Sequence, residues 1–123
     1  MNQQTLDLRA DIIDVRDLTD LLDRPAPSDP DEFAVYLQVV DLLEGLAGEG
    51  GDHQWHGTWY PAYLVADDHF IDYAKRLAED IGAVDLHATW PIKHIDWEAA
   101  ARALRSDYSL VVVGGLEYWY PTR

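Results

Sequence analysis

Carboxylates recur at short intervals near the start of the chain, where Asp residues follow one another at a spacing of four and then of three. The series consists of Asp7, Asp11, Asp14, Asp17, Asp20 and Asp23. On an α-helix, which rises about 1.5 Å per residue, carboxylates three residues apart climb about 4.5 Å per step, and outward-splayed side chains approach the spacing of nucleic-acid phosphates. The series therefore has two interpretations: an imitation of part of a DNA strand, or a solvated helix face on which Asp14 or Asp17 caps the N-terminus.

A second group of acids continues the pattern through a span that contains no base. Its members are Asp29, Asp31, Glu32, Asp41, Glu44 and Glu49. No Lys or Arg occurs between Arg24 and Lys75, whereas the surfaces of soluble proteins normally mix both signs of charge. This span favours an anionic surface that binds a partner. A third, secondary group follows in the next predicted helix and consists of Asp67, Asp68, Asp72, Glu79 and Asp80.

The charge of the whole chain limits the class of partner. The 123 residues carry a formal net charge of -14, with 13 acids and 3 bases in residues 1–52 and 10 acids and 6 bases in residues 53–123. Such a chain repels phosphates, so we expect no direct binding to nucleic acid or to a membrane. The expected partner is a basic protein, including one that itself holds DNA or RNA. Halophilic adaptation also makes proteins acidic, but it would spread acid over the whole surface.

Histidines beside carboxylates raise the question of a metal site or of acid–base catalysis. The histidines in question are His53, His56 and His69. Glycines on both sides of the first two predict a loop, in which ordinary hydrogen bonds explain the histidines better than a metal does. Asp67 and Asp68 are more simply explained as helix caps than as catalytic carboxylates. Since the sequence also lacks the motifs of serine hydrolases, nucleotide-binding loops and zinc proteases, we expect no enzyme and no cofactor.

Other features of the composition bear on compartment and size. The chain has no cysteine, no stretch approaching 18 apolar residues and no secretory signal in its first ten residues, which predicts a cytoplasmic protein. The hydrophobic share of 48% argues against disorder. The length predicts a single domain, 1–123, with an acidic helical part over 1–52 and an aromatic-rich part over 53–123.

Apolar periodicity, caps and glycines predict the elements that carry these residues. Helices are expected over about 14–24, 30–47, 68–81 and 97–105. The residues expected to cap the last three are Asp29 or Ser28, Asp67 or Asp68, and Asp96. Residues 58–66 predict a strand in which Pro61 requires an edge position or a bulge, and Gly114-Gly115 predicts a hairpin between 109–113 and 116–120. The expected fold class is α+β, with helices packed on a short antiparallel sheet and the aromatic residues in the core.

Three segments of the second half carry a family resemblance. They read FIDYAKRLAEDIGAV over 70–84, HIDWEAAARALRSDYSLV over 94–111 and LEYWY over 116–120. They resemble the ArdA-type antirestriction proteins and small phage and prophage proteins related to them, over roughly the last 55 to 70 residues. GEGGDHQWHGTWYPAY over 48–63 resembles the phage proteins alone. The positions that match the family motifs are Asp80, Gly82, Asp96, Trp97, Glu98 and Asp107.

The resemblance implies an α+β inhibitor that acts as a DNA mimic and occupies the basic nucleic-acid-binding surface of a host defence complex. The chain has room for one family module instead of three, so an anti-CRISPR role on a Cas complex is nearly as well supported as an antirestriction role. The runner-up is an immunity or antitoxin-type protein that caps one dedicated basic toxin. A small hydrolase that uses the histidine-containing loop comes third. The oligomeric state stays open, and a homodimer is among the expected assemblies.

Overall fold

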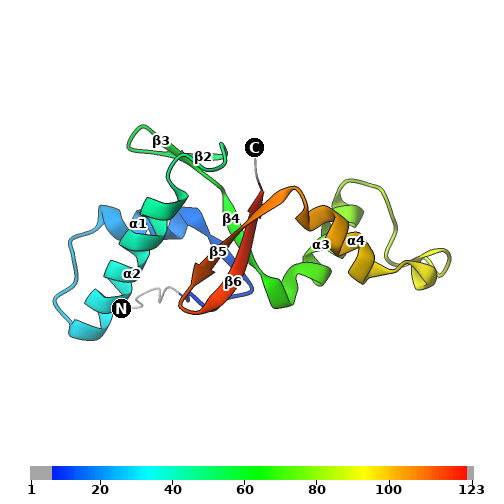
Figure 1. Ribbon diagram of the computed structural model, residues 1–123, viewed down its shortest axis with the longest axis horizontal. Helices are drawn as coiled ribbons and strands as arrows, with labels where there is room; N and C mark the ends of the chain where they lie inside the picture. Colours follow the sequence, from blue (N-terminus) through cyan, green and yellow to red (C-terminus); the bar gives the residue numbers. More distant parts are fainter. Residues whose placement is uncertain (1–6, 122–123) are drawn as a thin grey trace.

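The computed structural model describes residues 7–121, which form a central antiparallel sheet between two pairs of helices (Figure 1). The four strands of the sheet run in the order β1-β4-β6-β5. Their bounds are Ile12–Asp14 for β1, Tyr63–Ala66 for β4, Tyr108–Val113 for β5 and Leu116–Pro121 for β6. The helices are α1 (Val15–Asp23), α2 (Pro30–Leu46), α3 (Phe70–Asp80) and α4 (Trp97–Arg105). The predicted α+β class is therefore confirmed, including the C-terminal hairpin of β5 and β6.

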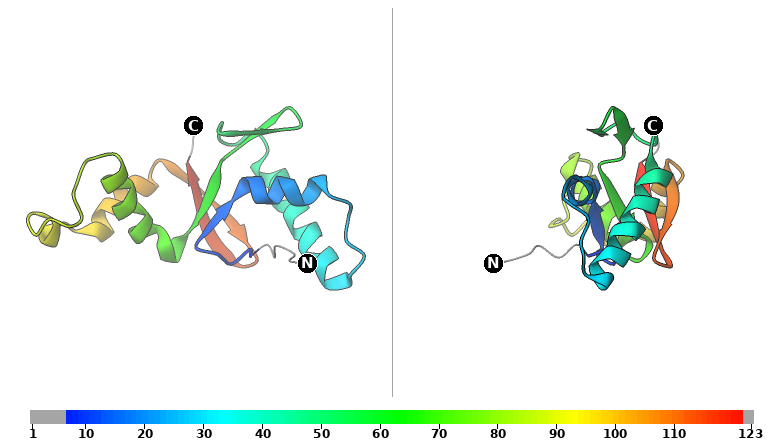
Figure 2. Two further views of the ribbon diagram at one scale, coloured as in Figure 1. Left: turned by 180° about the vertical axis from the view of Figure 1, so that it is seen from behind. Right: turned by 90° about the vertical axis from the view of Figure 1, so that its left-hand side faces the viewer.

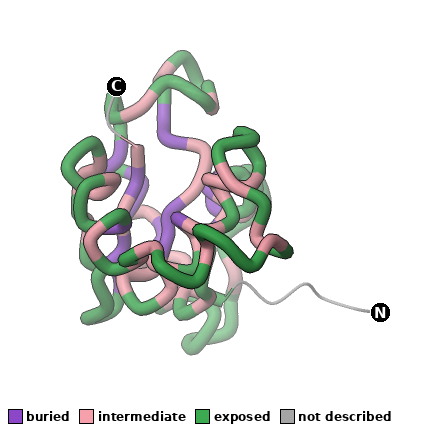
Figure 3. Tube along the Cα trace, turned by 90° about the vertical axis from the view of Figure 1, so that its right-hand side faces the viewer, coloured by how far each residue is buried: buried purple, intermediate pink, exposed green. Residues whose placement is uncertain are grey.

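Each face of the sheet packs against its own pair of helices. Strand side chains alternate between faces, so Leu64 and Tyr118 join the core formed with α1 and α2, whereas the neighbouring Val65 and Trp119 pack with α3 and α4. The two helix pairs consequently lie at opposite ends of the molecule (Figure 2). Figure 3 shows the buried segments gathered in the middle, with exposed helix and loop segments around them.

The helix boundaries follow the predicted capping signals at three of the four helices. The Asp14 carboxylate accepts a hydrogen bond from the Arg16 amide at the start of α1. Asp29 accepts from the amides of Asp31 and Glu32 at the start of α2, where Pro30 occupies the first turn. Asp96 accepts from the amide of Ala99 at the start of α4. These caps satisfy amides that have no partner within a helix, which explains why the boundaries could be read locally.

The predicted N-terminal cap of the remaining helix, α3, is wrong. A 3-10 turn, η1 (Asp67–His69), precedes α3, and neither Asp67 nor Asp68 caps the helix with its side chain. The Asp67 carboxylate instead accepts hydrogen bonds from the Trp119 indole at 3.0 Å and from Arg105 at 3.3 Å. Because Asp67 accepts hydrogen bonds from two residues distant in the sequence, its carboxylate does not cap the helix that follows. A second 3-10 turn, η2 (Ile92–His94), leads into α4.

Three segments outside the helices differ from the expectation. Residues Ile12–Asp14, for which no strand was predicted, form β1, which pairs with β4 about fifty residues later. The segment around His53 and His56 is not a loop but a hairpin of β2 (His53–Trp55) and β3 (Thr58–Tyr60). The strand expected over 58–66 is divided into β3 and β4 by Pro61 and Ala62, and β4 is an interior strand. Pro61 lies outside both strands, so its missing amide disrupts neither ladder.

Glycine is required where the β2–β3 hairpin meets the rest of the chain. Gly50 has a φ of +74°, and a Cβ at this position would lie 2.7 Å from the Cα of Pro61. Backbone hydrogen bonds from Gly48 to Trp59 and from Asp52 to Tyr60 fix the hairpin on either side of this close approach. The glycine run after α2 therefore holds the hairpin against the start of β4.

The aromatic residues divide between core and surface. Tyr60, Phe70, Tyr118 and Tyr120 are buried, as expected. The tryptophans are not: Trp55, Trp97 and Trp119 are half-buried, Trp59 is exposed, and Trp90 is 76% exposed. The prediction that the aromatic residues fill the core is therefore wrong for Trp, whose size and indole N–H suit the partly wet positions next to the core.

Candidate partner-binding surface

The first helix presents two of the predicted carboxylates directly to solvent. Its inner face carries the buried Val15, Leu18 and Thr19, and a helical turn of 100° per residue places Asp17 and Asp20 on the opposite face. Both are exposed, and neither side chain makes a hydrogen bond or ion pair within residues 7–121. A partner can engage them without breaking a hydrogen bond or ion pair of the described residues, although both also act electrostatically on Arg16.

The rest of the N-terminal aspartate series does not continue this helix. Asp14 caps α1 and pairs with Arg16 at 2.9 Å, and hydrogen bonding from that guanidinium holds the pKa of the Asp14 carboxyl below its usual value. Asp23 accepts a hydrogen bond from the Trp55 indole at 3.0 Å and lies near His56. Asp7 and Asp11 precede β1, so the six carboxylates of the series do not lie on one helix. The β-branched Ile12 and Ile13 favour the strand that interrupts it.

The second helix adds four outward carboxylates. Its inner face carries Val39, Leu42, Leu43 and Leu46, all buried. Asp41 and Glu44 lie opposite this face, and Asp31 and Glu32 are exposed in the first turn. None of the four side chains makes a hydrogen bond or ion pair in the described part of the chain. Of the other two predicted residues here, Asp29 caps the helix, and exposed Glu49 accepts a hydrogen bond from the hydroxyl of Tyr120 at 3.3 Å.

We refer to six residues as the helical acidic surface: Asp17, Asp20, Asp31, Glu32, Asp41 and Glu44. Figure 1 shows both helices that carry it at the same end of the molecule. Two exposed apolar side chains lie on α2 among these acids, Phe33 at 40% exposure and Leu37 at 47%. The sequence did not identify these two as surface residues, because their spacing equals that of a core-facing stripe.

The helix dipoles of α1 and α2 determine which acids stabilise their helix and which destabilise it. Asp31 and Glu32 lie in the first turn of α2, where a negative charge is favourable. Glu44 lies in its last turn, and Asp23 ends α1, yet neither helix has a base in its last turn. Carboxylates at these C-terminal ends oppose the dipole, so helix stability does not explain their presence.

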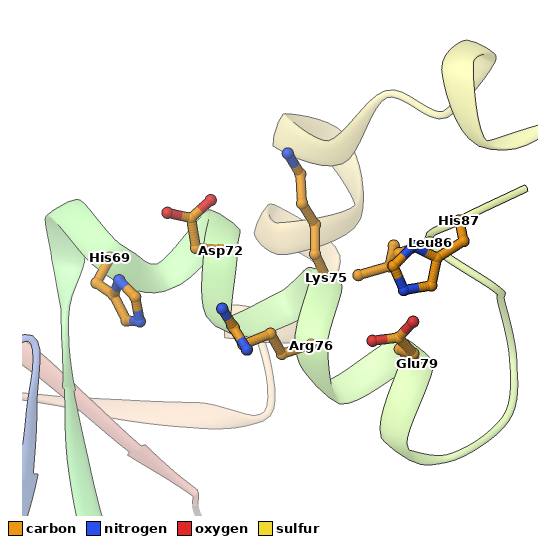
Figure 4. Close-up of a pocket in the computed structure, with 7 residues that line it drawn as sticks. All are labelled: His69, Asp72, Lys75, Arg76, Glu79, Leu86 and His87. Atoms are coloured by element: carbon orange, nitrogen blue, oxygen red, sulfur yellow. The ribbon is translucent and has the colours of Figure 1, made fainter. Parts of the chain in front are cut away.

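The acids of the third group have mixed surroundings. Asp67 is engaged by Trp119 and Arg105, whereas Asp68 is exposed. Figure 4 shows Asp72 and Glu79 on α3 together with Lys75 and Arg76. These side chains line a pocket of about 480 Å³ with His69, Leu86 and His87. Asp80 borders a second groove of about 510 Å³ that also contains Arg16 and Arg76. Interleaved bases make this face less anionic than the helical acidic surface.

The structure also shows how far these pockets can support catalysis. Asp72 and Glu79 are seven residues apart on one helix, a rise of about 10 Å, which exceeds the reach of a shared proton. The two bases on the helix lie between them in sequence. Asp72 and Glu79 therefore do not form a pair that shares a proton.

The three histidines of the metal hypothesis go to three separate partners. His53 Nε2 lies 2.9 Å from the hydroxyl of Thr19, which itself donates to the Arg16 carbonyl, so the ring acts as the donor. His56 faces Asp23 at 3.4 Å, and His69 faces Asp11 at 3.7 Å. Over residues 7–121, His, Asp and Glu side chains form no group of three or more that could hold a metal ion.

A chain of three tyrosine hydroxyls joins α3 to the sheet, and sequence reasoning missed it. Tyr73 lies 2.6 Å from Tyr63 and 2.5 Å from Tyr108, hydroxyl to hydroxyl. Burial raises the pKa of Tyr108 to about 12 and also raises that of Tyr73, so both stay protonated at neutral pH. Because the three residues are 10 and 35 positions apart, no local pattern could have identified the chain.

Comparison of the chain with protein-family models, curated proteins and solved structures found no match. The residues that carry the antirestriction resemblance have visible structural roles at two positions: Gly82 ends α3 with a φ of +79°, and Asp96 caps α4. Asp80, Glu98 and Asp107 are exposed, and Trp97 is half-buried. In the described residues, no helix has both the length and the apolar character needed to cross a membrane.

Proposed function

We propose that this protein is an anti-defence inhibitor that acts as a DNA mimic in the cytoplasm of a host cell. The helical acidic surface would occupy the basic nucleic-acid-binding surface of a defence complex, either restriction–modification or CRISPR–Cas. One observation carries the proposal: six exposed carboxylates on α1 and α2 make no hydrogen bond or ion pair within residues 7–121, and the four on α2 lie in a span that has no base from residue 25 to residue 74. Mixed-sign surfaces suffice for solubility, so this separation of charge needs another explanation.

The placement of individual acids supports the proposal. Glu44 opposes the dipole of its own helix, and Asp17 and Asp20 repel each other on one exposed face. Such residues cost folding stability and contribute to an anionic field that steers basic partners. Phe33 and Leu37 supply apolar contacts beside the charges, the combination expected at an interface core.

Capture followed by competition tests this proposal. The chain is used as bait for host-cell proteins at about 0.1 M salt and eluted at about 1 M, a range over which the Debye length falls from about 10 Å to about 3 Å. A captured DNA- or RNA-binding defence complex that is displaced by its own nucleic acid supports mimicry. Binding that persists at high salt, or that nucleic acid does not displace, contradicts it.

Two charge-matched variants locate the surface. The first carries Asp17→Asn, Asp20→Asn and Asp41→Asn, and we expect its affinity to fall about threefold to a hundredfold. The second carries Glu98→Gln, Asp107→Asn and Glu117→Gln, the same change in net charge, and we expect a much smaller loss. Equal losses would show that total charge acts instead of the helical acidic surface.

The second candidate, an immunity or antitoxin-type protein, predicts a different response. A dedicated interface concentrates its binding energy in a few residues, so one replaced patch abolishes binding while the others have little effect. A mimic loses affinity in proportion to the number of acids removed. Replacement of adjacent pairs along α1 and α2 distinguishes a graded loss from a collapse at one patch.

A further inference from the structure

The two edges of the central sheet are built differently. At one edge, β1 has only three residues, ends at Asp14 and leads directly into α1. At the other edge, β5 has six residues with the sequence YSLVVV. Its pairing with β6 runs without a bulge from Tyr108 to Val113. Figure 2 shows the two edges on opposite sides of the sheet in its right-hand view.

Strand β5 lacks the features that normally protect an edge. Natural edge strands are shortened, charged, interrupted by proline or bulged, because an unpaired row of amides and carbonyls invites another strand. β5 contains no charged residue and no proline, and within residues 7–121 no strand pairs with its outer side. The short β1, with its terminal carboxylate, does have such protection.

The side chains of β5 leave an apolar face uncovered. Val111 and Val113 pack into the core shared with α1 and α2. On the other face, α3 covers Tyr108 through Phe70 and Tyr73 but does not extend over the rest of the strand. Leu110 is 44% exposed and Val112 is 59% exposed. An uncharged backbone edge therefore lies beside two exposed aliphatic side chains.

We propose that β5 pairs antiparallel with β5 of a second copy of this chain, which joins two sheets into one of eight strands. An antiparallel strand pair is compatible with a two-fold axis, so the strand is its own complement. With the axis perpendicular to the sheet and close to Leu110 or Val111, the exposed Leu110 and Val112 of both copies lie together on one face. Because β5 carries no charged side chain, two acidic chains can pair along it without bringing carboxylates of β5 face to face. A basic partner would gain no charge neutralisation from β5, so a second copy is the better occupant.

The size and charge of this interface determine how it responds to concentration and salt. One pair of six-residue strands buries less than the roughly 1,000 Å² typical of stable interfaces, so we expect a dimer with a dissociation constant on the order of micromolar or weaker. Each copy carries a net charge of -14, so screening of their repulsion strengthens the dimer as salt rises. Binding to a basic partner responds to salt in the opposite direction.

Sedimentation of the purified full chain over a range of concentrations tests the proposal without any partner. We expect dimer at high concentration, with a larger dimer fraction at about 1 M salt than at about 0.1 M. Val112→Lys should remain monomeric. Ile12→Lys is the matched control, because Ile12 is 45% exposed on the same face at the opposite edge, and it should dimerise like the unmodified chain. A circular dichroism melt checks that both variants are folded.

A cross-link supplies a second measurement. Because the chain has no cysteine, Leu110→Cys and Val111→Cys each introduce a single thiol near the expected two-fold axis. Opposed Cα atoms in antiparallel strands lie about 4.5–5.5 Å apart, within the range that a disulfide can span. We expect one of the two to form a disulfide-linked dimer under mild oxidation, and Ile12→Cys to stay monomeric. A chain that is monomeric up to about 1 mM, or a dimer lost in Ile12→Lys and kept in Val112→Lys, would overturn the proposal.

Discussion

The N-terminal and C-terminal helix pairs cover opposite faces of one sheet, yet they use their carboxylates in opposite ways. On α1 and α2, the acids Asp17, Asp20 and Asp41 are exposed and make no hydrogen bond or ion pair within residues 7–121. Beside α3 and α4, Asp67 binds the Trp119 indole and Arg105, and its neighbours on α3 alternate with bases. Net charge alone therefore does not distinguish the two regions. They differ in which carboxylates the fold engages in hydrogen bonds and ion pairs.

The two regions also differ in how they pack. The N-terminal pair buries aliphatic side chains such as Leu18 and Leu46 against the sheet. The C-terminal pair packs through Phe70, whose ring contacts Tyr73, Tyr108 and Trp119, with the Arg105 guanidinium 5.3 Å from its centre. Stability and partner binding are thus expected to respond to different mutations, and the following predictions test that separation.

The largest expected effect is on the aromatic core of the C-terminal pair. Phe70 is fully buried, so Phe70→Ala should lower the free energy of unfolding by about 3–5 kcal/mol. Denaturant titration measures the loss, and Trp90→Ala, at a tryptophan that is 76% exposed, is the control with an expected change within about 0.5 kcal/mol. A small effect at Phe70 would mean that α3 and α4 contribute little to the core.

The next prediction compares the stability contributions of two adjacent acids, Asp67, which accepts hydrogen bonds, and Asp68, which is exposed. Asp67→Ala removes the acceptor for the Trp119 indole and for Arg105, and we expect a loss of about 2 kcal/mol in unfolding free energy. Asp68→Ala, one residue later at an exposed position, should change stability by less than about 0.5 kcal/mol. Equal losses would show that both acids act through their position near the helix start.

The sequence alone was sufficient for the elements whose signals are local. Asp29 and Pro30 mark the start of α2, Gly82 marks the end of α3, and Gly114-Gly115, with φ values of +58° and +84°, forms the turn of the β5–β6 hairpin. It failed where pairing joins distant segments. β1 exists because Ile12 and Ile13 pair with a strand about fifty residues away, a partner that no local pattern specifies.

The candidate surface was predictable to a similar extent. Outward acids on α1 and α2 follow from helical periodicity once the buried stripe is known, and Asp17, Asp20, Asp41 and Glu44 are exposed in the structure. The engagement of Asp67 was not predictable, since its donors lie 38 and 52 residues away. Sequence patterns thus indicate which acids are present, but the fold determines which are left free.

The tyrosine chain should make stability depend on alkaline pH. Burial raises the pKa of Tyr108 to about 12 in the folded protein, against about 10 when unfolded, and Tyr73 shifts in the same direction. Between these values the folded state holds more protons, so the stabilisation is complete below pH 10 and is lost as pH rises toward 12. Denaturant midpoints measured from pH 8 to 12 should fall over this window, and Tyr108→Phe should flatten the decline. An unchanged slope in that variant would assign the alkaline loss to other groups.

The smallest expected change in stability comes from Glu44, whose replacement should change folding stability and partner binding in opposite directions. Glu44 lies in the last turn of α2, where a positive charge is favourable, so Glu44→Lys should raise the free energy of unfolding by about 0.3–1 kcal/mol and weaken binding to the captured partner. Asp31→Lys, in the first turn of the same helix, should weaken binding as well but lower stability by a similar amount. Thermal melts and the salt-eluted capture assay measure the two quantities separately. If Glu44→Lys raised stability and left binding intact, α2 would have an acidic surface without a role in partner recognition.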